Sequence, residues 1–387
     1  MITANINRRQ FLKTTAAGAV VSSIAPSALS ATTKQQVPGY LKDYSNLYSK
    51  NPRKAAIEWF RNAKFGLFMH YGLYSIPAGI YNGKKYTHVS EWLQYWAKIH
   101  VKKYAEFAKD FTAENFDADA IADIAVAAEM KYINITSRHH DSFCLWNTKE
   151  TNFNTVNTPA KRDIIKELAE ACRKRDLGLC LYYSHGRDWR HPHAPNNDCW
   201  GGRARPEFKT PDPAYKYGKD HDLQKYVKFI KNQITELLTN YGPITAIWLD
   251  GIGVPFNPKG DSNLNEFHCQ DLYDHIHNLQ PQVLVSYKQG LLGTEDFKAP
   301  EHKAVEAEKN TPIEICTTLQ KGSWGFKQWA GWRNFDEAKH KLGIARKSNA
   351  NLLLNVGPKG DGTFPAEAAQ TLRKLGTAIR RDGWPTA

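Results

Sequence analysis

Seven short runs of apolar residues, separated by longer amphipathic stretches, constrain the fold of this chain more than any other feature. The runs are FGLFM (65–69), YINIT (132–136), GLCLYY (178–183), ITAIWL (244–249), QVLVSY (282–287), IEICTTL (313–319) and NLLLNV (351–356). Each run is apolar at nearly every position, which is typical of strands covered on both faces of a parallel sheet. No run is followed by a Gly-x-Gly-x-x-Gly motif, so the sequence does not favour a dinucleotide-binding sheet. We therefore predict an α/β fold, a (β/α)8 TIM-like barrel in which some helices are irregular or missing.

Amphipathic helices are predicted between these runs. Apolar residues recur at three-to-four spacing in 119–130 and 163–175, and the stretch 223–242 ends at Gly242, a natural helix C-cap. The segment 188–215 is instead long, polar and rich in Pro and Gly. We predict an extended loop there, and loops of this length are often functional.

The first 30 residues have the features of an export signal. Residues 7–13 read NRRQFLK and are followed by a run of small and apolar residues. Paired arginines in this context resemble the twin-arginine signal, which exports folded proteins. We expect residues 1–30 to be the export signal, residues 31–55 an N-terminal extension and residues 56–387 the barrel. The expected location is the periplasm or the exterior of the cell.

The net charge of the chain is strongly positive. Lys and Arg number 52 and Asp and Glu 39, which gives +13. The expected export signal carries Arg8, Arg9 and Lys13 and no acidic residue, so removing it lowers the charge from +13 to +10. A basic balance indicates an anionic partner. No arginine cluster with interleaved aromatic residues indicates nucleic acid, and no other stretch is apolar enough to span a membrane, so we expect neither as a partner.

Polar side chains follow most of the predicted strands. They are His70, the run from Ser137 to Asp141, the run from Ser184 to Trp189, Asp250 and Lys288, and the later segment GTEDFKAPEH adds Glu295, Asp296 and Glu301. The carboxyl ends of the strands of an α/β barrel meet at one mouth, where catalytic groups sit. We therefore expect these side chains to converge, and their repetition at successive strand ends carries more weight than any single residue.

Imidazoles, aromatic rings and two separated carboxylates suit chemistry on sugars. Acetal cleavage needs one carboxylate at the anomeric carbon and another group that protonates the leaving oxygen. Asp250, flanked by Trp248 and by Gly251, which lets the chain turn without crowding the site, is the best candidate for the first role. On the residues alone, a helix N-cap is an equally good interpretation of Asp250.

Nine segments of the chain match a known enzyme family in the family's own order, from about residue 59 to about residue 365. They are FGLFMHYGLYSIPA, SEWLQYW, TSRHHDSFCLWNTKETNFNTV, KRDIIKELAEACRK, LYYS, IWLDG, APE, WGF and NLLLNVGPKGDGTFP. With these motifs the chain resembles glycoside hydrolase family 29, the retaining α-L-fucosidases. The resemblance implies a glycoside hydrolase that releases terminal α-L-fucosyl residues from glycans through a covalent glycosyl-enzyme intermediate.

The same resemblance implies roles for individual residues. Asp250 matches the family nucleophile. Glu301 is the favoured acid/base, with Glu295 second and Glu306 and Glu308 weaker candidates. The residues that match the pocket for the sugar ring are His70, Glu91, Trp92, His139, His140, Tyr182, Trp248 and Trp324. Tyr183 is the alternative to Tyr182, because both lie in LYYS.

Two departures from the family pattern leave the exact substrate open. The last barrel motif is usually followed by a β-sandwich, but only about twenty residues follow it here, so we expect no C-terminal β-sandwich. Arg138, Ser142 and Lys288 stand where Lys, Gly and Arg are commoner. An α-L-galactosidase of the same fold and a non-catalytic fucose-binding barrel are therefore alternatives. The expected partner is a fucosylated or L-galactosylated oligosaccharide or polysaccharide, and the positive charge favours an anionic one.

Metal binding is a weaker interpretation of the histidines. Adjacent residues on an extended chain point opposite ways, so one ion rarely takes both His139 and His140. His191 and His193 lie beside prolines that favour an extended rim loop. The six cysteines are irregularly spaced and form no C-x-x-C motif, so we interpret them as buried small residues. We expect no metal and no cofactor.

Overall fold

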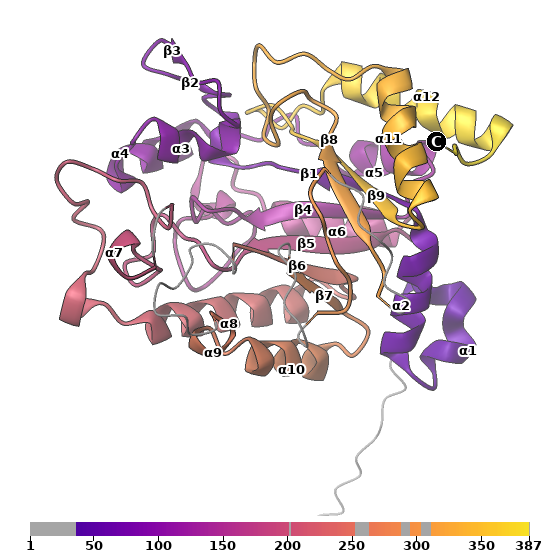
Figure 1. Cartoon of the computed structure of the whole chain (residues 1–387), viewed down its shortest axis with the longest axis horizontal. Coiled ribbons are helices and arrows are strands. Elements are labelled where there is room, and N and C mark those ends of the chain that lie inside the picture. The colour runs from indigo at the N-terminus through magenta and orange to yellow at the C-terminus, as the bar shows by residue number, and fades with distance from the viewer. Residues whose placement is uncertain (1–35, 201–202, 252–262, 288–294, 303–310, 387) are drawn as a thin grey trace, which may run out of the picture. The chain divides into compact units, whose positions relative to one another are not determined.

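Figure 1 shows the computed structural model, which describes residues 36–200, 203–251, 263–287, 295–302 and 311–386. The expected export signal lies outside the described residues, as do Lys288, Glu306 and Glu308. Among the helices of the described ranges, none is long and apolar enough to cross a membrane.

Seven parallel strands form one continuous sheet in the order β7-β6-β5-β4-β1-β9-β8. The strands are β1 Phe65–Met69, β4 Tyr132–Arg138, β5 Gly178–Ser184, β6 Ala246–Asp250, β7 Leu284–Tyr287, β8 Glu314–Thr318 and β9 Asn351–Val356. Every residue of these strands is buried, as expected for a parallel sheet covered on both faces. The structure thus confirms all seven predicted strands. A separate two-stranded hairpin is made by β2 Ile80–Tyr81 and β3 Lys84–Lys85.

The segment 296–302 fills the place between β7 and β8. Its main-chain bonds run from Asp296 N to Val285 O (2.7 Å), from Cys316 N to Pro300 O (3.1 Å) and from His302 N to Cys316 O (2.9 Å). Its pairing with β8 is parallel, and Glu301 lies opposite Cys316. Eight parallel segments therefore surround the core, and the predicted (β/α)8 barrel is confirmed. Glu301 stands near the carboxyl end of the eighth segment.

Helices alternate with the strands along most of the chain (Figure 1). The α-helices are α1 Ser45–Tyr48, α2 Pro52–Ala63, α3 Leu93–Trp96, α4 Val101–Tyr104, α5 Ala118–Ala127, α6 Ile164–Arg173, α7 Asn197–Trp200, α8 Leu223–Asn240, α9 Asn263–Glu266, α10 Cys269–Leu279, α11 Phe335–Lys347 and α12 Ala366–Asp382. Short 3-10 helices are η1 Gly39–Tyr44, η2 Leu73–Ser75, η3 Ser90–Trp92, η4 Ala105–Asp110, η5 Thr155–Asn157 and η6 Gly218–Asp220.

The three helices predicted from the sequence are α5, α6 and α8. Each begins at an aspartate whose side chain accepts a hydrogen bond from a main-chain N–H of the first turn. These N-caps are Asp117, Asp163 and Asp222, and such a cap stabilises a helix by about 1 kcal/mol. Helix α8 ends just before Gly242, whose φ of 78° is the left-handed geometry that glycine favours.

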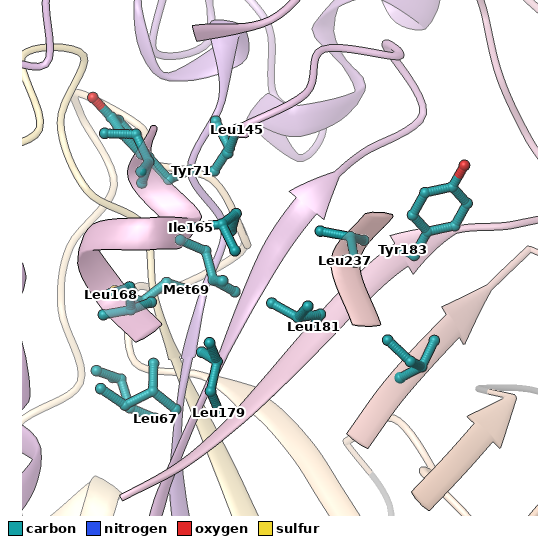
Figure 2. Packing of buried hydrophobic residues seen from close by; sticks show 14 of the residues in the cluster. Leu67, Met69, Tyr71, Leu145, Ile165, Leu168, Leu179, Leu181, Tyr183 and Leu237 are labelled. Carbon is teal, nitrogen blue, oxygen red and sulfur yellow. The ribbon is translucent and has the colours of Figure 1, made fainter. Parts of the chain in front are cut away.

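Alternation along the strands separates two apolar layers. Leu67 and Met69 of β1, like Leu179, Leu181 and Tyr183 of β5, point outward and pack with side chains of α6 and α8, as Figure 2 shows. The residues between them point inward into a second cluster that holds Phe68, Tyr182, Trp248 and Leu353. Because side chains fill the barrel interior, it is a packed core rather than a channel.

Helix α2 covers the amino ends of the strands. Its Phe60 ring lies 5.5 Å from that of Tyr132, the first residue of β4, and 4.5 Å from that of Phe297. Trp59 packs on the same tyrosine at 6.2 Å. Aromatic packing therefore closes this end of the barrel, and the polar residues that follow the strands lie at the opposite, carboxyl end.

Candidate active site

A cavity of about 220 Å³ lies at the carboxyl end of the barrel. It is lined by Phe68, His70, Val89, Glu91, Trp92, His139, His140, Tyr182, Arg187, Trp248, Asp250, Glu301, Cys316 and Trp324. All ten residues predicted for the site from the sequence are among them. The volume is below the roughly 300–1,000 Å³ of pockets that hold drug-sized ligands, so the cavity suits a single small ring.

Asp250 ends β6 and is held from several sides. The Tyr182 hydroxyl donates a hydrogen bond to its Oδ2 at 2.7 Å, and His140 Nε2 lies 3.8 Å from the same oxygen. Its main-chain carbonyl accepts hydrogen bonds from the N–H groups of His185 and Gly186. Only 5% of the residue is exposed. A carboxylate so restrained has one orientation, which is what attack on a fixed carbon requires.

Gly251 has a conformational reason to be glycine. Its φ is 86°, and a Cβ atom there would stand 3.4 Å from the main-chain N of Arg187 and 3.5 Å from the Cγ of the same residue. The glycine therefore allows the turn after β6 while Arg187 packs against it, which agrees with the interpretation made from the sequence.

The two tyrosines of LYYS point to opposite faces of β5, because successive strand residues alternate. Tyr182 faces the barrel interior, where its hydroxyl bonds Asp250. The Tyr183 hydroxyl donates instead to Gln233 of α8 at 2.8 Å, and its ring lies under the Arg138 guanidinium at 4.3 Å. Tyr182 is therefore the pocket tyrosine of this pair.

Three histidines stand on neighbouring walls of the cavity. His70 Nδ1 lies 2.7 Å from the side-chain oxygen of Asn355, which follows from the adjacency of β1 and β9. His139 stacks on the Tyr182 ring at 5.4 Å. His140 Nδ1 lies 2.5 Å from Ser184 Oγ, and that hydroxyl donates its hydrogen to the main chain of Arg187. His140 Nδ1 must therefore be the donor to Ser184.

Glu91, Trp92 and Trp324 form a wall from segments distant in sequence. Glu91 is buried, with 2% of the residue exposed, and its Oε2 accepts a hydrogen bond from Gly325 N at 3.0 Å. The Trp92 ring meets that of His140 edge-on at 5.3 Å. Because Glu91 ties η3 to the loop after β8, the wall has a defined position.

Glu301 stands on another wall and is more open than Asp250. Trp324 Nε1 donates to its Oε1 at 3.2 Å, and His302 Nε2 lies 3.5 Å from the same oxygen. The Glu301 side chain is 34% exposed, against 6% for the Asp250 side chain. Glu295, the second candidate for the acid/base, precedes the eighth segment and does not line the cavity.

Sequence reasoning missed a buried carboxyl behind the pocket. Glu314 begins β8 and bonds Trp248 Nε1 at 2.9 Å through Oε1 and the Tyr132 hydroxyl at 2.5 Å through Oε2. Burial raises the pKa of Glu314 to about 7. It fixes Trp248, which stacks on Tyr182 at 5.5 Å. The one sequence signal that could have identified this glutamate as a buried residue is its position within an apolar strand.

Arg138 and Ser142, which depart from the family pattern, lie behind the pocket wall and do not line it. Arg138 forms a buried ion pair with Asp188, and Ser142 Oγ donates to the same carboxylate at 2.8 Å. Ser142 has a φ of 70°, which is why glycine is favoured there. These two substitutions therefore act on the packing behind the wall and do not touch the cavity.

His185 and His191 lie outside the cavity lining and pack against aromatic side chains. His185 is buried against Phe267 and Tyr287, and burial lowers its pKa to about 3. His191 packs on Tyr226 and Phe229. Within the described ranges, no group of three or more His, Cys, Asp or Glu side chains gathers in a way that could hold a metal ion. The five cysteines whose side chains the structure describes are buried, as predicted.

Comparison with known proteins identifies relatives that are similar to this chain in sequence and in fold. The model of the alpha-L-fucosidase family matches residues 28–383. The plasma alpha-L-fucosidases of Pongo abelii and Homo sapiens are 32% and 30% identical to the chain, each match covering 84% of this chain and 68% of the relative. Among solved structures, alpha-L-fucosidase AlfC from Lactobacillus casei in complex with alpha-L-fucose product matches with a TM-score of 0.73 and 31% identity, over 84% of this chain and 98% of AlfC. Alpha-L-fucosidase isoenzyme 1 from Paenibacillus thiaminolyticus matches with a TM-score of 0.74 and 31% identity, over 87% and 79%.

Proposed function

The chain belongs to the alpha-L-fucosidase family, and we propose that it hydrolyses terminal α-L-fucosyl residues from glycans with retention of anomeric configuration. The observation that carries this proposal is the pairing of two unlike carboxyl groups in one small cavity. Asp250 is fixed by Tyr182 at 2.7 Å, and Glu301 stands on another wall near solvent. This is the pair of groups that a retaining glycosidase requires.

In the first step, Asp250 attacks the anomeric carbon of the bound fucosyl group. The bond between that carbon and the glycosidic oxygen breaks as the bond to Asp250 Oδ1 or Oδ2 forms. Glu301 gives its proton to the departing oxygen, so the leaving sugar departs as an alcohol. The Tyr182 hydroxyl and His140 keep the attacking carboxylate in place while its charge is consumed.

In the second step, water hydrolyses the glycosyl-enzyme. Glu301, now a carboxylate, takes a proton from the water as the water oxygen bonds to the anomeric carbon, and Asp250 leaves with its charge restored. The exposure of Glu301 suits this exchange, because water must reach it after the leaving sugar has gone. Two inversions at the same carbon give net retention.

The size and lining of the cavity explain why the enzyme removes a terminal sugar of a glycan. The aromatic rings of Phe68, Trp248 and Trp324 line it. Such rings pack against the apolar side of a sugar ring, while His70, His139 and Glu91 present the polar atoms that hydroxyl groups need. A volume of about 220 Å³ accepts one ring and leaves the rest of the glycan outside.

The test is hydrolysis of 4-nitrophenyl α-L-fucoside beside 4-nitrophenyl α-L-galactoside by the purified protein, with the released anomer followed by NMR. We expect faster release from the fucoside, with the α-anomer appearing first. Faster release from the galactoside would make the protein an α-L-galactosidase. Saturable fucose binding without hydrolysis of either substrate would make it a sugar-binding barrel. Appearance of the β-anomer first would rule out retention.

We also propose that the protein is exported by the twin-arginine route and acts in the periplasm or outside the cell. The support is the sequence NRRQFLK, with Arg8 and Arg9, ahead of an apolar run. Replacing both arginines with lysine is expected to leave the fucosidase activity in the cytoplasmic fraction. Unchanged export of this double variant would contradict the proposed route.

A further inference from the structure

We propose that Arg187 and Arg203 form a second subsite at the mouth of the fucose pocket, which binds an anionic group on the leaving sugar. The anionic group is a sulfate ester or a carboxylate, because both present negatively charged oxygen atoms that a guanidinium group binds in the same way. This inference rests on the proposed fucosidase function and adds to it the chemical class of the glycan.

Arg187 is a buried cation on the wall of the cavity, and among the described residues no carboxylate forms an ion pair with it. Only 5% of the residue is exposed, and its guanidinium carbon lies 5.1 Å from the centre of the Trp92 ring. Its Nε donates to the main-chain carbonyl of Arg203 at 3.0 Å. Among the described residues, no hydrogen bond or ion pair uses its two terminal nitrogens. These Nη groups therefore remain available to a ligand in the cavity.

Arg203 continues the same surface toward solvent. Its side chain is exposed, and its guanidinium carbon lies 5.7 Å from the centre of the Trp96 ring. His88, also exposed, stacks on that ring at 3.9 Å. Trp96 lies 6.4 Å from Trp92, so two aromatic rings underlie the two arginines. Aromatic rings of this kind hold guanidinium groups by cation–π contact and leave their N–H edges free to bind.

The charge around these residues favours an anion. Asp250 is the carboxylate whose charge acts most strongly on Arg187. Burial and the charge of Glu207 raise the pKa of Tyr95, whereas Arg203 and Arg187 lower it. Asp250 is already bound by Tyr182, and it becomes an ester in the intermediate. On the side of Tyr95, Trp92 and Trp96, two guanidinium groups therefore stand against one described carboxylate, Glu207, and this side of the cavity mouth is positive. Guanidinium groups bind carboxylates and sulfates in paired, charge-assisted hydrogen bonds.

The test compares the kcat/KM values of matched substrate pairs. One pair is an α-L-fucosyl-N-acetylglucosamine disaccharide with and without a sulfate on the N-acetylglucosamine, and the other is an α-L-fucosyl glucuronate beside the corresponding glucoside. We expect the wild-type protein to prefer at least one acidic member about tenfold or more, the size typical of a charge-assisted hydrogen bond. The preferred pair identifies the source of the anion. In Arg203→Gln and Arg187→Gln the preference should fall toward equality.

The controls separate this inference from the proposed function. Arg373→Gln removes an exposed arginine of α12 and should keep the preference. Arg203 is exposed, so its variant tests the subsite even if Arg187→Gln fails to fold. Equal hydrolysis of the acidic and neutral members of both pairs would overturn the subsite and leave the fucosidase function standing. If no substrate is hydrolysed, calorimetry with the intact disaccharides and Asp250→Ala still decides: tighter binding of an acidic member supports the subsite, and equal binding contradicts it.

Discussion

The two carboxyl groups assigned to catalysis, Asp250 and Glu301, are supported in opposite ways. Asp250 ends strand β6, its side chain is 6% exposed, and it is bound by a tyrosine that stacks on His139 and on Trp248. Glu301 lies near the end of the segment 296–302 between β7 and β8, its side chain is 34% exposed, and it contacts the indole of Trp324 and the imidazole of His302. The first arrangement fixes a charge in position, and the second leaves a group in reach of water.

This difference matches the demands of the two roles. A nucleophile must hold one orientation through two displacements, whereas an acid/base must lose a proton and regain one from water. Rigid support therefore belongs on the Asp250 side and solvent access on the Glu301 side. The predictions that follow test whether each side carries the role that its surroundings suit.

The largest effect is expected from loss of the nucleophile. Asp250→Ala should lower kcat on the order of 10⁴-fold or more, because the covalent path is removed. Added azide should restore turnover by attacking from the face that Asp250 occupied, and the fucosyl azide should have inverted configuration. Kinetics and NMR of the product check both points. Retained activity in this variant would contradict the assignment.

Removal of the acid/base should have a smaller effect that depends on the leaving group. Glu301→Gln should lower turnover of glycan substrates by about 10²–10⁴-fold, the usual contribution of general acid–base catalysis. The loss should be smaller for 4-nitrophenyl α-L-fucoside, whose leaving group needs little protonation, and azide should here give a product of retained configuration. Glu295→Gln is the matched control. If the loss and the azide product appear in Glu295→Gln instead, the roles of the two glutamates must be exchanged.

The support of Asp250 can be tested with neighbouring tyrosines. Tyr182→Phe removes the 2.7 Å hydrogen bond to Asp250 and should lower kcat/KM by roughly 10- to 100-fold, the range for a hydrogen bond to a charged group. Tyr183→Phe removes a hydroxyl of the same type on the outer face of β5, where it bonds Gln233. That control should affect stability more than turnover. Equal losses of kcat/KM in the two variants would contradict a specific role for the hydrogen bond between Tyr182 and Asp250.

The smallest effect on turnover is expected at Glu314, whose signature is the pH dependence of stability. Its pKa is raised from 4.5 to about 7, so across this window the folded protein keeps a proton that the unfolded chain has lost. The free energy of unfolding should therefore fall by roughly 3 kcal/mol as pH rises through the window. Asp141, with its pKa raised to about 6, adds a fall of the same sign at lower pH.

Urea unfolding at pH 5 and pH 8 checks this expectation. Glu314→Gln cannot ionise, yet its amide can still accept from Trp248 and donate to Tyr132. The variant should lose roughly 3 kcal/mol less than the wild-type protein between the two pH values. An identical loss in both proteins would mean that Glu314 does not supply this pH dependence.

The same contrast explains what the sequence could predict. The seven strands were predicted because each is buried on both faces and so has an uninterrupted apolar run. Asp250 followed from its place directly after one of them. The eighth segment, 296–302, was not predicted as a strand, because Asp296, Lys298 and Pro300 interrupt its apolar pattern. Glu301 therefore depended on the family resemblance.

Other parts of the site depend on contacts between distant segments. Arg187 was visible as part of a polar strand end, but only the fold places its guanidinium over Trp92. Glu314 looks like an isolated polar residue in an apolar strand until Trp248 and Tyr132 are seen to bond it. The residues in these contacts are far apart in the sequence, so the periodicity of a single segment could not reveal that they meet.

The most direct test of the account is to trap the covalent intermediate. An α-L-fucosyl fluoride with fluorine at C2 should form the intermediate readily and hydrolyse it slowly, because the electronegative fluorine destabilises both oxocarbenium-like transition states while fluoride remains a good leaving group. Mass spectrometry of the digested protein should find one fluorofucosyl group on the peptide that contains Asp250, and none in Asp250→Ala. A label on another residue, or turnover without any label, would contradict the central claim that Asp250 is the nucleophile.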